Sequence, residues 1–273
     1  MKKKYVLFLF LTFQFNAFSQ TSEDWFQLGE EAYDAENYQK AQECYKEAAN
    51  LGSSKACGAL AYMYYYGGIK IIENGQTKSR NPELAELWAK RAGEHNNIEA
   101  DAVMALIQYY KGNFSETIRI LNNWDIKKGL SEAKLALAIC YMINKKENNK
   151  AEKLIKSVYD ETRYEKDAPD YFYVASALLA KIEYDKWEKD GNIKTHQNCE
   201  IYISPLIEPI QELFCPLATY IMAKELYEVG NENEKELCKN LIEIASKYNY
   251  YKNRFELLYP FSEEINQYYN MIK

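Results

Sequence analysis

Few residues of this chain have the types and spacing that catalysis or metal binding requires. Its 273 residues include two histidines, His95 and His196, so a histidine-based triad or zinc site would depend on one isolated side chain. Paired acids such as Glu30-Glu31 could act as a general acid and base, but at helical spacing in polar surroundings they are typical of a solvated face. Phosphate loops and the usual hydrolase motifs do not occur. We therefore expect a protein that is not an enzyme and holds no cofactor.

The cysteines do not form a metal-binding or redox motif either. There are six, and none is spaced as Cys-x-x-Cys: Cys44, Cys57, Cys140, Cys199, Cys215 and Cys238. In an oxidising compartment an even number permits disulfides, and buried free thiols are the alternative.

Residues 1–19 have the three parts of a secretory signal peptide. Three consecutive lysines precede an apolar run from Tyr5 to about Phe15, and small residues, Ala17 and Ser19, occupy the positions that signal peptidase favours. The run is shorter than the roughly 20 apolar residues that span a bilayer. We expect cleavage near Ser19 and an exported protein, periplasmic or extracellular, with no integral membrane segment.

The acidic composition argues against a nucleic-acid partner. The formal charge is −6, and it becomes −9 without residues 1–19, which contain three lysines and no acids. A phosphate backbone would repel such a chain, which has no clustered basic stretch after the signal peptide. The low content of glycine and proline, 11 and 6 residues, favours helices over a turn-rich β fold.

Large and small residues recur along the chain in a pattern that predicts packed helices, and these helices must position any functional site. The first unit of the pattern contains Trp25, Leu28, Gly29, Ala41, Tyr45 and Ala48. Small residues at such positions let two antiparallel helices approach closely, and the large residues fill the remaining space. The pattern resembles a tetratricopeptide repeat, although Ala32 stands where that family has a tyrosine.

A second unit has a longer connection between its helices. It runs from Ala56 to Gly67, continues through a polar loop over 68–80, and resumes at Asn81-Pro82, a capping residue followed by a proline suited to the first helical position. The long loop and the glycine that follows the tyrosines resemble a Sel-one-like repeat, the longer relative of the tetratricopeptide repeat.

The resemblance weakens towards the C-terminus. We expect tetratricopeptide- or Sel-one-like repeats over residues 22–160, in about four units, degenerate helical repeats over 165–246, and a segment over 247–273 that caps the open end. The predicted fold is all-α, a right-handed α-solenoid of stacked antiparallel helix pairs. Pro205 and Pro209 are expected to kink or break the second helix of the fifth unit.

The resemblance also implies a concave groove lined by the first helix of each pair. Carried over position by position, the groove-facing places hold ten aromatic residues: Phe26, Tyr33, Tyr62, Tyr65, Tyr66, Tyr109, Tyr110, Tyr184, Tyr220 and Tyr227. Asp34, Leu106, Lys181 and Lys224 occupy four further places. Tyrosine offers a large contact area with a polar tip, which suits a binding surface. The alternative is that several of these tyrosines pack between neighbouring helices.

By resemblance, the expected function is that of a non-catalytic scaffold that binds an unknown peptide or protein segment in the groove. One alternative is a structural subunit of an envelope complex that uses its convex face, and another is a carbohydrate-binding or hydrolytic protein. If the tyrosines serve binding, Tyr65→Ala and Tyr109→Ala should leave the melting temperature within a few degrees, whereas Tyr45→Ala should lower it far more.

Cys44 and Cys57 fall on neighbouring helices of such an array. They lie in the second helix of the first unit and the first helix of the next. A disulfide between them would close a short loop and stabilise the fold by roughly 3 kcal/mol.

Overall fold

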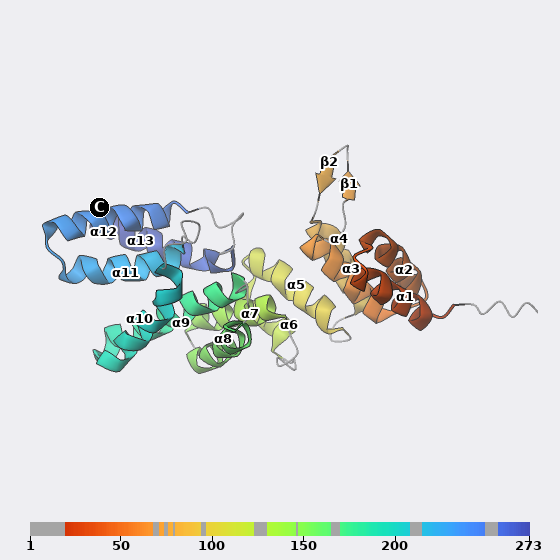
Figure 1. Ribbon diagram of the computed structural model, residues 1–273, viewed down its shortest axis with the longest axis horizontal. Coiled ribbons are helices and arrows are strands. Elements are labelled where there is room, and N and C mark those ends of the chain that lie inside the picture. Colours follow the sequence, from red (N-terminus) through yellow and green to blue (C-terminus); the bar gives the residue numbers. More distant parts are fainter. Residues whose placement is uncertain are drawn as a thin grey trace, which may run out of the picture.

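The computed structural model shows an elongated array of helices with one short hairpin (Figure 1). The residues that it describes are 20–67, 71–73, 76–78, 80–93, 97–122, 130–145, 147–164, 170–207, 215–248 and 256–273. The predicted signal peptide, residues 1–19, lies outside them.

Twelve of the described helices form six consecutive pairs. The first three pairs are α1 (Ser22–Asp34) with α2 (Tyr38–Asn50), α3 (Ser54–Tyr66) with α4 (Pro82–Ala92), and α5 (Ile98–Tyr110) with α6 (Phe114–Leu121). The next three are α7 (Ser131–Asn144) with α8 (Asn148–Thr162), α9 (Asp170–Asp190) with α10 (Ile193–Ile207), and α11 (Pro216–Val229) with α12 (Glu232–Ser246). The first helices α3, α5, α7, α9 and α11 also contact one another in this order. The predicted all-α solenoid is therefore confirmed.

A β-hairpin interrupts the second pair. Strands β1 (Ile71–Glu73) and β2 (Gln76–Lys78) are antiparallel, with Ile71 opposite Lys78. The hairpin projects from the array between α3 and α4 (Figure 1). The segment expected to be a polar loop thus contains a small element of its own.

Close packing of α1 on α2 depends on a glycine, as the sequence pattern predicts. A Cβ atom at Gly29 would lie 2.5 Å from two ring carbons of Tyr45, which is 1% exposed. Ala41 and Ala48 on α2 are fully buried. Small residues therefore make room for the tyrosine between the two helices.

We expect Gly29→Ala to destabilise the protein by about 1–3 kcal/mol, because its methyl group would overlap the Tyr45 ring. In an unconstrained helix the same change stabilises by about 0.5–1 kcal/mol. Urea unfolding shows whether Gly29→Ala lowers or raises the free energy of unfolding. In the double variant Gly29→Ala/Tyr45→Leu, the cost should be smaller than the sum of the single variants. A more stable Gly29→Ala protein would show that the helices are not held this closely.

Helix ends agree with the local chemistry of the sequence. The Asn81 side chain accepts a hydrogen bond from the Leu84 amide at 2.9 Å, and Pro82 is the first residue of α4, as predicted. Pro205 lies in the last turn of α10, which ends two residues later at Ile207. Pro209 lies outside the described residues.

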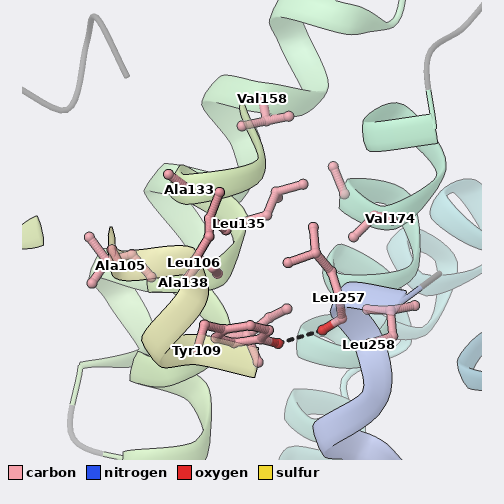
Figure 2. Packing of buried hydrophobic residues seen from close by; sticks show 14 of the residues in the cluster. Ala105, Leu106, Tyr109, Ala133, Leu135, Ala138, Val158, Val174, Leu257 and Leu258 are labelled. Atoms are coloured by element: carbon pink, nitrogen blue, oxygen red, sulfur yellow. Dashed lines mark hydrogen bonds between the residues drawn. The ribbon is translucent and has the colours of Figure 1, made fainter. Parts of the chain in front are cut away.

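The C-terminal segment contacts more of the array than the open end that it was expected to cap. The 3-10 helix η3 (Glu256–Phe261) contacts α7, and α13 (Ser262–Ile272) contacts α12. Figure 2 shows Leu257 and Leu258 of η3 packed beside Tyr109 of α5 and Val174 of α9. The segment therefore packs against the first helices of the array as well as its last pair, and does not simply cap the open end.

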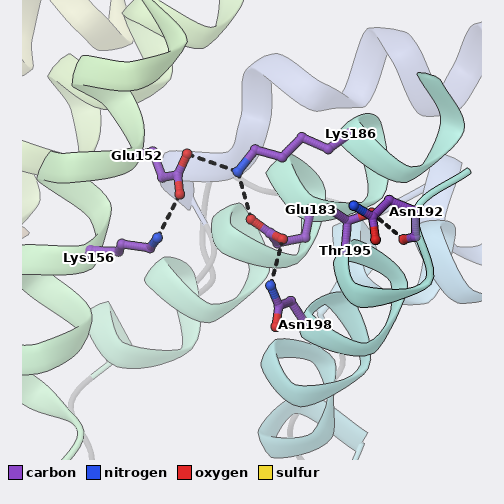
Figure 3. A network of polar contacts seen from close by, with 7 residues as sticks. All are labelled: Glu152, Lys156, Glu183, Lys186, Asn192, Thr195 and Asn198. Atoms are coloured by element: carbon purple, nitrogen blue, oxygen red, sulfur yellow. Dashed lines mark hydrogen bonds and ion pairs between the residues drawn. The ribbon is translucent and has the colours of Figure 1, made fainter. Parts of the chain in front are cut away.

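A polar network joins α8, α9 and α10 (Figure 3). The ammonium group of Lys186 bonds to Glu152 at 3.0 Å and to Glu183 at 2.7 Å, and the Asn198 amide donates to Glu183 at 3.0 Å. Glu183 is only 5% exposed, so its carboxylate needs these partners. The network fixes the position of α9, which carries part of the site described below.

All six cysteines are buried free thiols, so the predicted Cys44–Cys57 disulfide is not formed in this structure. Among the described helices, none combines the length and the apolar character that crossing a membrane requires.

Candidate functional site

The structure divides the ten predicted groove residues into two groups. Four are no more than 2% exposed and belong to the core: Tyr65, Tyr109, Tyr184 and Tyr220. Six are partly exposed: Phe26, Tyr33, Tyr62, Tyr66, Tyr110 and Tyr227. For the first group the expectation of an accessible groove side chain is wrong.

Contacts with other segments explain the burial of three of these tyrosines. The Tyr109 hydroxyl donates to the Leu257 carbonyl of η3, and the guanidinium group of Arg80 lies 4.9 Å from the centre of the Tyr65 ring. Tyr220 packs against Tyr268 of α13, with ring centres 5.6 Å apart.

We call the surface formed by the first helices of the pairs the inner surface. Helix α13 covers this surface at the last two pairs. Lys181 of α9 is buried and pairs with Glu264 of α13 at 3.3 Å, as well as with Asp185 at 2.5 Å. The Tyr220 hydroxyl also donates to Glu264, at 3.3 Å. Lys181 and Tyr220 therefore hold the protein's own C-terminal helix, and the open part of the inner surface lies over the earlier pairs.

A first cavity, the N-terminal pocket, has a volume of about 320 Å³. Its lining comes mainly from α1, α2, α3 and α5: Glu30, Tyr33, Asp34, Tyr45, Ala59, Tyr62, Met63, Glu99 and Leu130. The buried Tyr45 hydroxyl donates to the Glu30 carboxylate, which fixes the Glu30 side chain at the pocket wall.

The N-terminal pocket has a strongly negative lining. Burial, and then the neighbouring Glu30, raise the pKa of Glu99 above its ordinary value. Burial also raises the pKa of Tyr62, with Glu99 as the second cause. Both shifts reflect the cost of concentrating negative charge between aromatic walls.

A second cavity, the central pocket, has a volume of about 360 Å³. It is lined by residues that precede α4 or belong to α3, α5, α7, α9 and η3: Tyr66, Arg80, Tyr110, Glu132, Asp170, Tyr171, Glu256 and Leu257. One side of it is thus made by the C-terminal segment.

Glu132 is the centre of the central pocket. This carboxylate is 7% exposed and accepts hydrogen bonds from the hydroxyls of Tyr66 at 2.6 Å, Tyr110 at 3.2 Å and Tyr171 at 3.3 Å. Burial, followed by the charge of Glu132, raises the pKa of each of these tyrosines well above its ordinary value. The three hydroxyls thus remain donors at neutral pH and hold their rings around one anion.

Arg80 supplies the positive charge of the central pocket. Its Nε donates to the Tyr65 carbonyl at 2.8 Å, and its guanidinium lies 3.8 Å from Glu256. Burial raises the pKa of Glu256, although Arg80 opposes this shift.

The two pockets adjoin on α3. Tyr62 lines the N-terminal pocket and Tyr66, one helical turn later, lines the central pocket, with ring centres 4.5 Å apart. We call the partly exposed tyrosines of both pockets the tyrosine strip: Tyr33, Tyr62, Tyr66, Tyr110 and Tyr171. The strip crosses α1, α3, α5 and α9, which are first helices of their pairs.

Apart from Asp34, sequence reasoning missed the charged residues of the two pockets, and it also missed Tyr171. Glu30 was considered only as one member of an acidic pair, and Arg80 only as the end of a loop. The sequence could have indicated Glu132 as a candidate site residue, because it is an acid in the first turn of α7, the first helix of its pair. Nothing local in the sequence indicates that Glu256 reaches the same pocket.

The site shows no arrangement for metal binding, since no three His, Cys, Asp or Glu side chains in the described ranges come together as a ligand set. Protein-family models, curated proteins and solved structures were all compared with the chain, and none of them matches it.

Proposed function

We propose that the protein is an exported, non-catalytic interaction scaffold that binds an extended peptide or protein segment along the tyrosine strip. The observation that carries this proposal is the pair of adjoining pockets on successive first helices. Side chains from α1 to α9 contribute to one surface, so an extended segment could contact several repeats at once.

The residue types of the strip suit recognition of a polypeptide. Tyrosine rings provide contact area at low cost in conformational entropy, and such side chains are common among the residues that dominate binding energies. The buried bonds of Glu132 hold three of the rings in place before a ligand arrives. A preorganised surface loses less entropy when it binds.

Selection from a random peptide library displayed on phage, with residues 20–273 as bait, tests the proposal. We expect selected peptides to bind the Tyr62→Ala variant about tenfold more weakly or worse, because loss of a central aromatic side chain removes on the order of 1–2 kcal/mol. Leu87→Ala is the matched control: Leu87 is 59% exposed on α4, a second helix, so affinity should not change. Circular dichroism verifies that both variants fold.

A second candidate is a structural subunit that docks through its second helices. It is favoured by large apolar side chains that are more than half exposed there, Leu87 on α4, Ile201 on α10, and Leu237 and Ile244 on α12. Peptides that lose affinity for Leu87→Ala but not for Tyr62→Ala would support this candidate and contradict the first. Glycans that bind in a Tyr62-dependent way, without any peptide binder, would instead support a carbohydrate-binding protein.

A further inference from the structure

Among the residues that the structure describes, three acids and no basic residue line the N-terminal pocket. Glu30, Asp34 and Glu99 line it, and none of the other described residues of its lining is a lysine, arginine or histidine. Within the part of the chain that the structure describes, no basic side chain forms a salt bridge with these three acids. Lys55, at the start of α3, pairs with Glu23 of α1 at 3.1 Å and not with a pocket residue.

The walls between the carboxylates are aromatic. Tyr33, Tyr45 and Tyr62 contribute to the lining, together with the apolar side chains of Met63 and Leu130. The face of a tyrosine ring attracts a cation. Carboxylates beside ring faces are therefore suited to an ammonium or guanidinium group with an apolar stem.

The central pocket shows the same chemistry with the protein's own cation in place. There the Arg80 guanidinium lies over the Tyr65 ring at 4.9 Å and near Glu256 at 3.8 Å. The N-terminal pocket has the rings and the acids, but no described residue of its lining is equivalent to Arg80. A cation supplied by a partner would complete it.

Size and charge point to a single side chain. A cavity of about 320 Å³ is at the lower end of the range for small-ligand sites, roughly 300–1,000 Å³, so it accommodates one long side chain and not a folded element. Burial is the main cause of the raised pKa of Glu99 and the charge of Glu30 is the second, and a positive group between the two acids would relieve their repulsion. The net charge of the mature chain also steers cationic partners towards it.

We infer that the N-terminal pocket binds a lysine or arginine side chain of the segment that occupies the tyrosine strip. This inference rests on the proposed function and adds the chemistry of the partner to it. The aliphatic stem of the side chain lies between the tyrosine rings, and its charged end lies between the carboxylates of Glu30 and Glu99, while Asp34 adds negative charge elsewhere on the lining.

The test uses short glycine-serine peptides that differ at one central position: lysine, arginine, norleucine, citrulline or glutamate. Binding is followed through the ¹³C-labelled methyl group of Met63, which lines the pocket. We expect the lysine and arginine peptides to shift this resonance at millimolar concentration or below, and the neutral and acidic peptides to bind at least about tenfold more weakly. Added salt should weaken the first two selectively.

Charge-neutralising variants show which acids bind the cationic side chain. Glu99→Gln and Asp34→Asn should each weaken the lysine and arginine peptides several-fold and leave the norleucine peptide unchanged. Glu31→Gln is the matched control, since Glu31 is an exposed acid on the same helix as Asp34 that does not line the pocket.

Equal binding of the norleucine and lysine peptides would overturn the inference, as would equal effects of Glu31→Gln and Glu99→Gln, or no shift of Met63 with any cationic peptide. Each of these results leaves the proposed function standing if library-selected peptides still depend on Tyr62. Loss of that dependence overturns the proposed function instead.

Discussion

Raising the pH from about 9 to about 12 is expected to unfold the protein in one cooperative step. Five tyrosines are no more than 2% exposed, Tyr45, Tyr65, Tyr109, Tyr184 and Tyr220, and burial raises the pKa of each well above the ordinary value near 10. Above pH 10 the unfolded chain releases these protons and the folded state keeps them. The stability linked to the shifts is therefore complete below pH 10 and is lost as the pH rises towards the folded pKa values.

The magnitude of this loss is large. Each tyrosine that ionises only after unfolding lowers the free energy of unfolding by about 1.4 kcal/mol per pH unit, so five lower it by about 7 kcal/mol per pH unit. Domains typically have about 5–15 kcal/mol of stability in total. Far-ultraviolet circular dichroism should report loss of helix, and tyrosinate absorbance should rise over the same pH interval.

Two phenylalanine variants serve as controls for the alkaline transition. The Tyr65 hydroxyl is buried without a hydrogen-bond partner, so Tyr65→Phe should keep or improve stability at neutral pH and move the alkaline midpoint upward by a few tenths of a pH unit. Tyr164 is 80% exposed, and Tyr164→Phe should leave the midpoint unchanged. Full tyrosine ionisation with the helix content intact would show that these side chains are accessible and that the core is wrongly assigned.

The repeat pattern predicts the fold well because its determinants are local. Gly29 and Tyr45 are 16 residues apart, and their contact defines the packing of α1 on α2. Asn81 with Pro82 likewise determines where α4 begins within a few residues of sequence. The hairpin was missed although Asn74-Gly75, a dipeptide favoured in two-residue hairpin turns, stands in the loop.

The site is predicted less well because the spacing of a repeat determines which way a side chain points and not what covers it. Tyr62 and Tyr66, which the repeat spacing placed in the expected groove, both line pockets. Tyr109 was expected in the same groove, but a residue 148 positions later in the chain covers it. A contact of that sequence separation leaves no trace in the local pattern of either segment.

The predicted tolerance of Tyr109→Ala is therefore replaced by its opposite. Tyr109 is fully buried, its hydroxyl donates to the Leu257 carbonyl, and the Tyr259 hydroxyl donates to the Tyr109 carbonyl at 2.8 Å. Its ring packs edge-on against Tyr110 and Tyr259, at 5.3 and 5.6 Å between centres. We expect Tyr109→Ala to cost about 3–5 kcal/mol, the range for large aromatic residues removed from a core, and to lower the melting temperature by roughly 6–20 °C.

The same substitution should also release the C-terminal segment, because Tyr109 is a principal contact of η3. Limited proteolysis followed by mass spectrometry should remove the segment 256–273 from Tyr109→Ala faster than from the parent protein. Tyr109→Phe keeps the ring and loses the bond to Leu257, so it should cost only about 1–3 kcal/mol and release the segment less readily. Tyr164→Ala, at an exposed position, should change neither measurement. A Tyr109→Ala protein that melts with the parent and resists proteolysis would mean that η3 does not pack on α5, and the inner surface would then extend as an open groove past the central pocket.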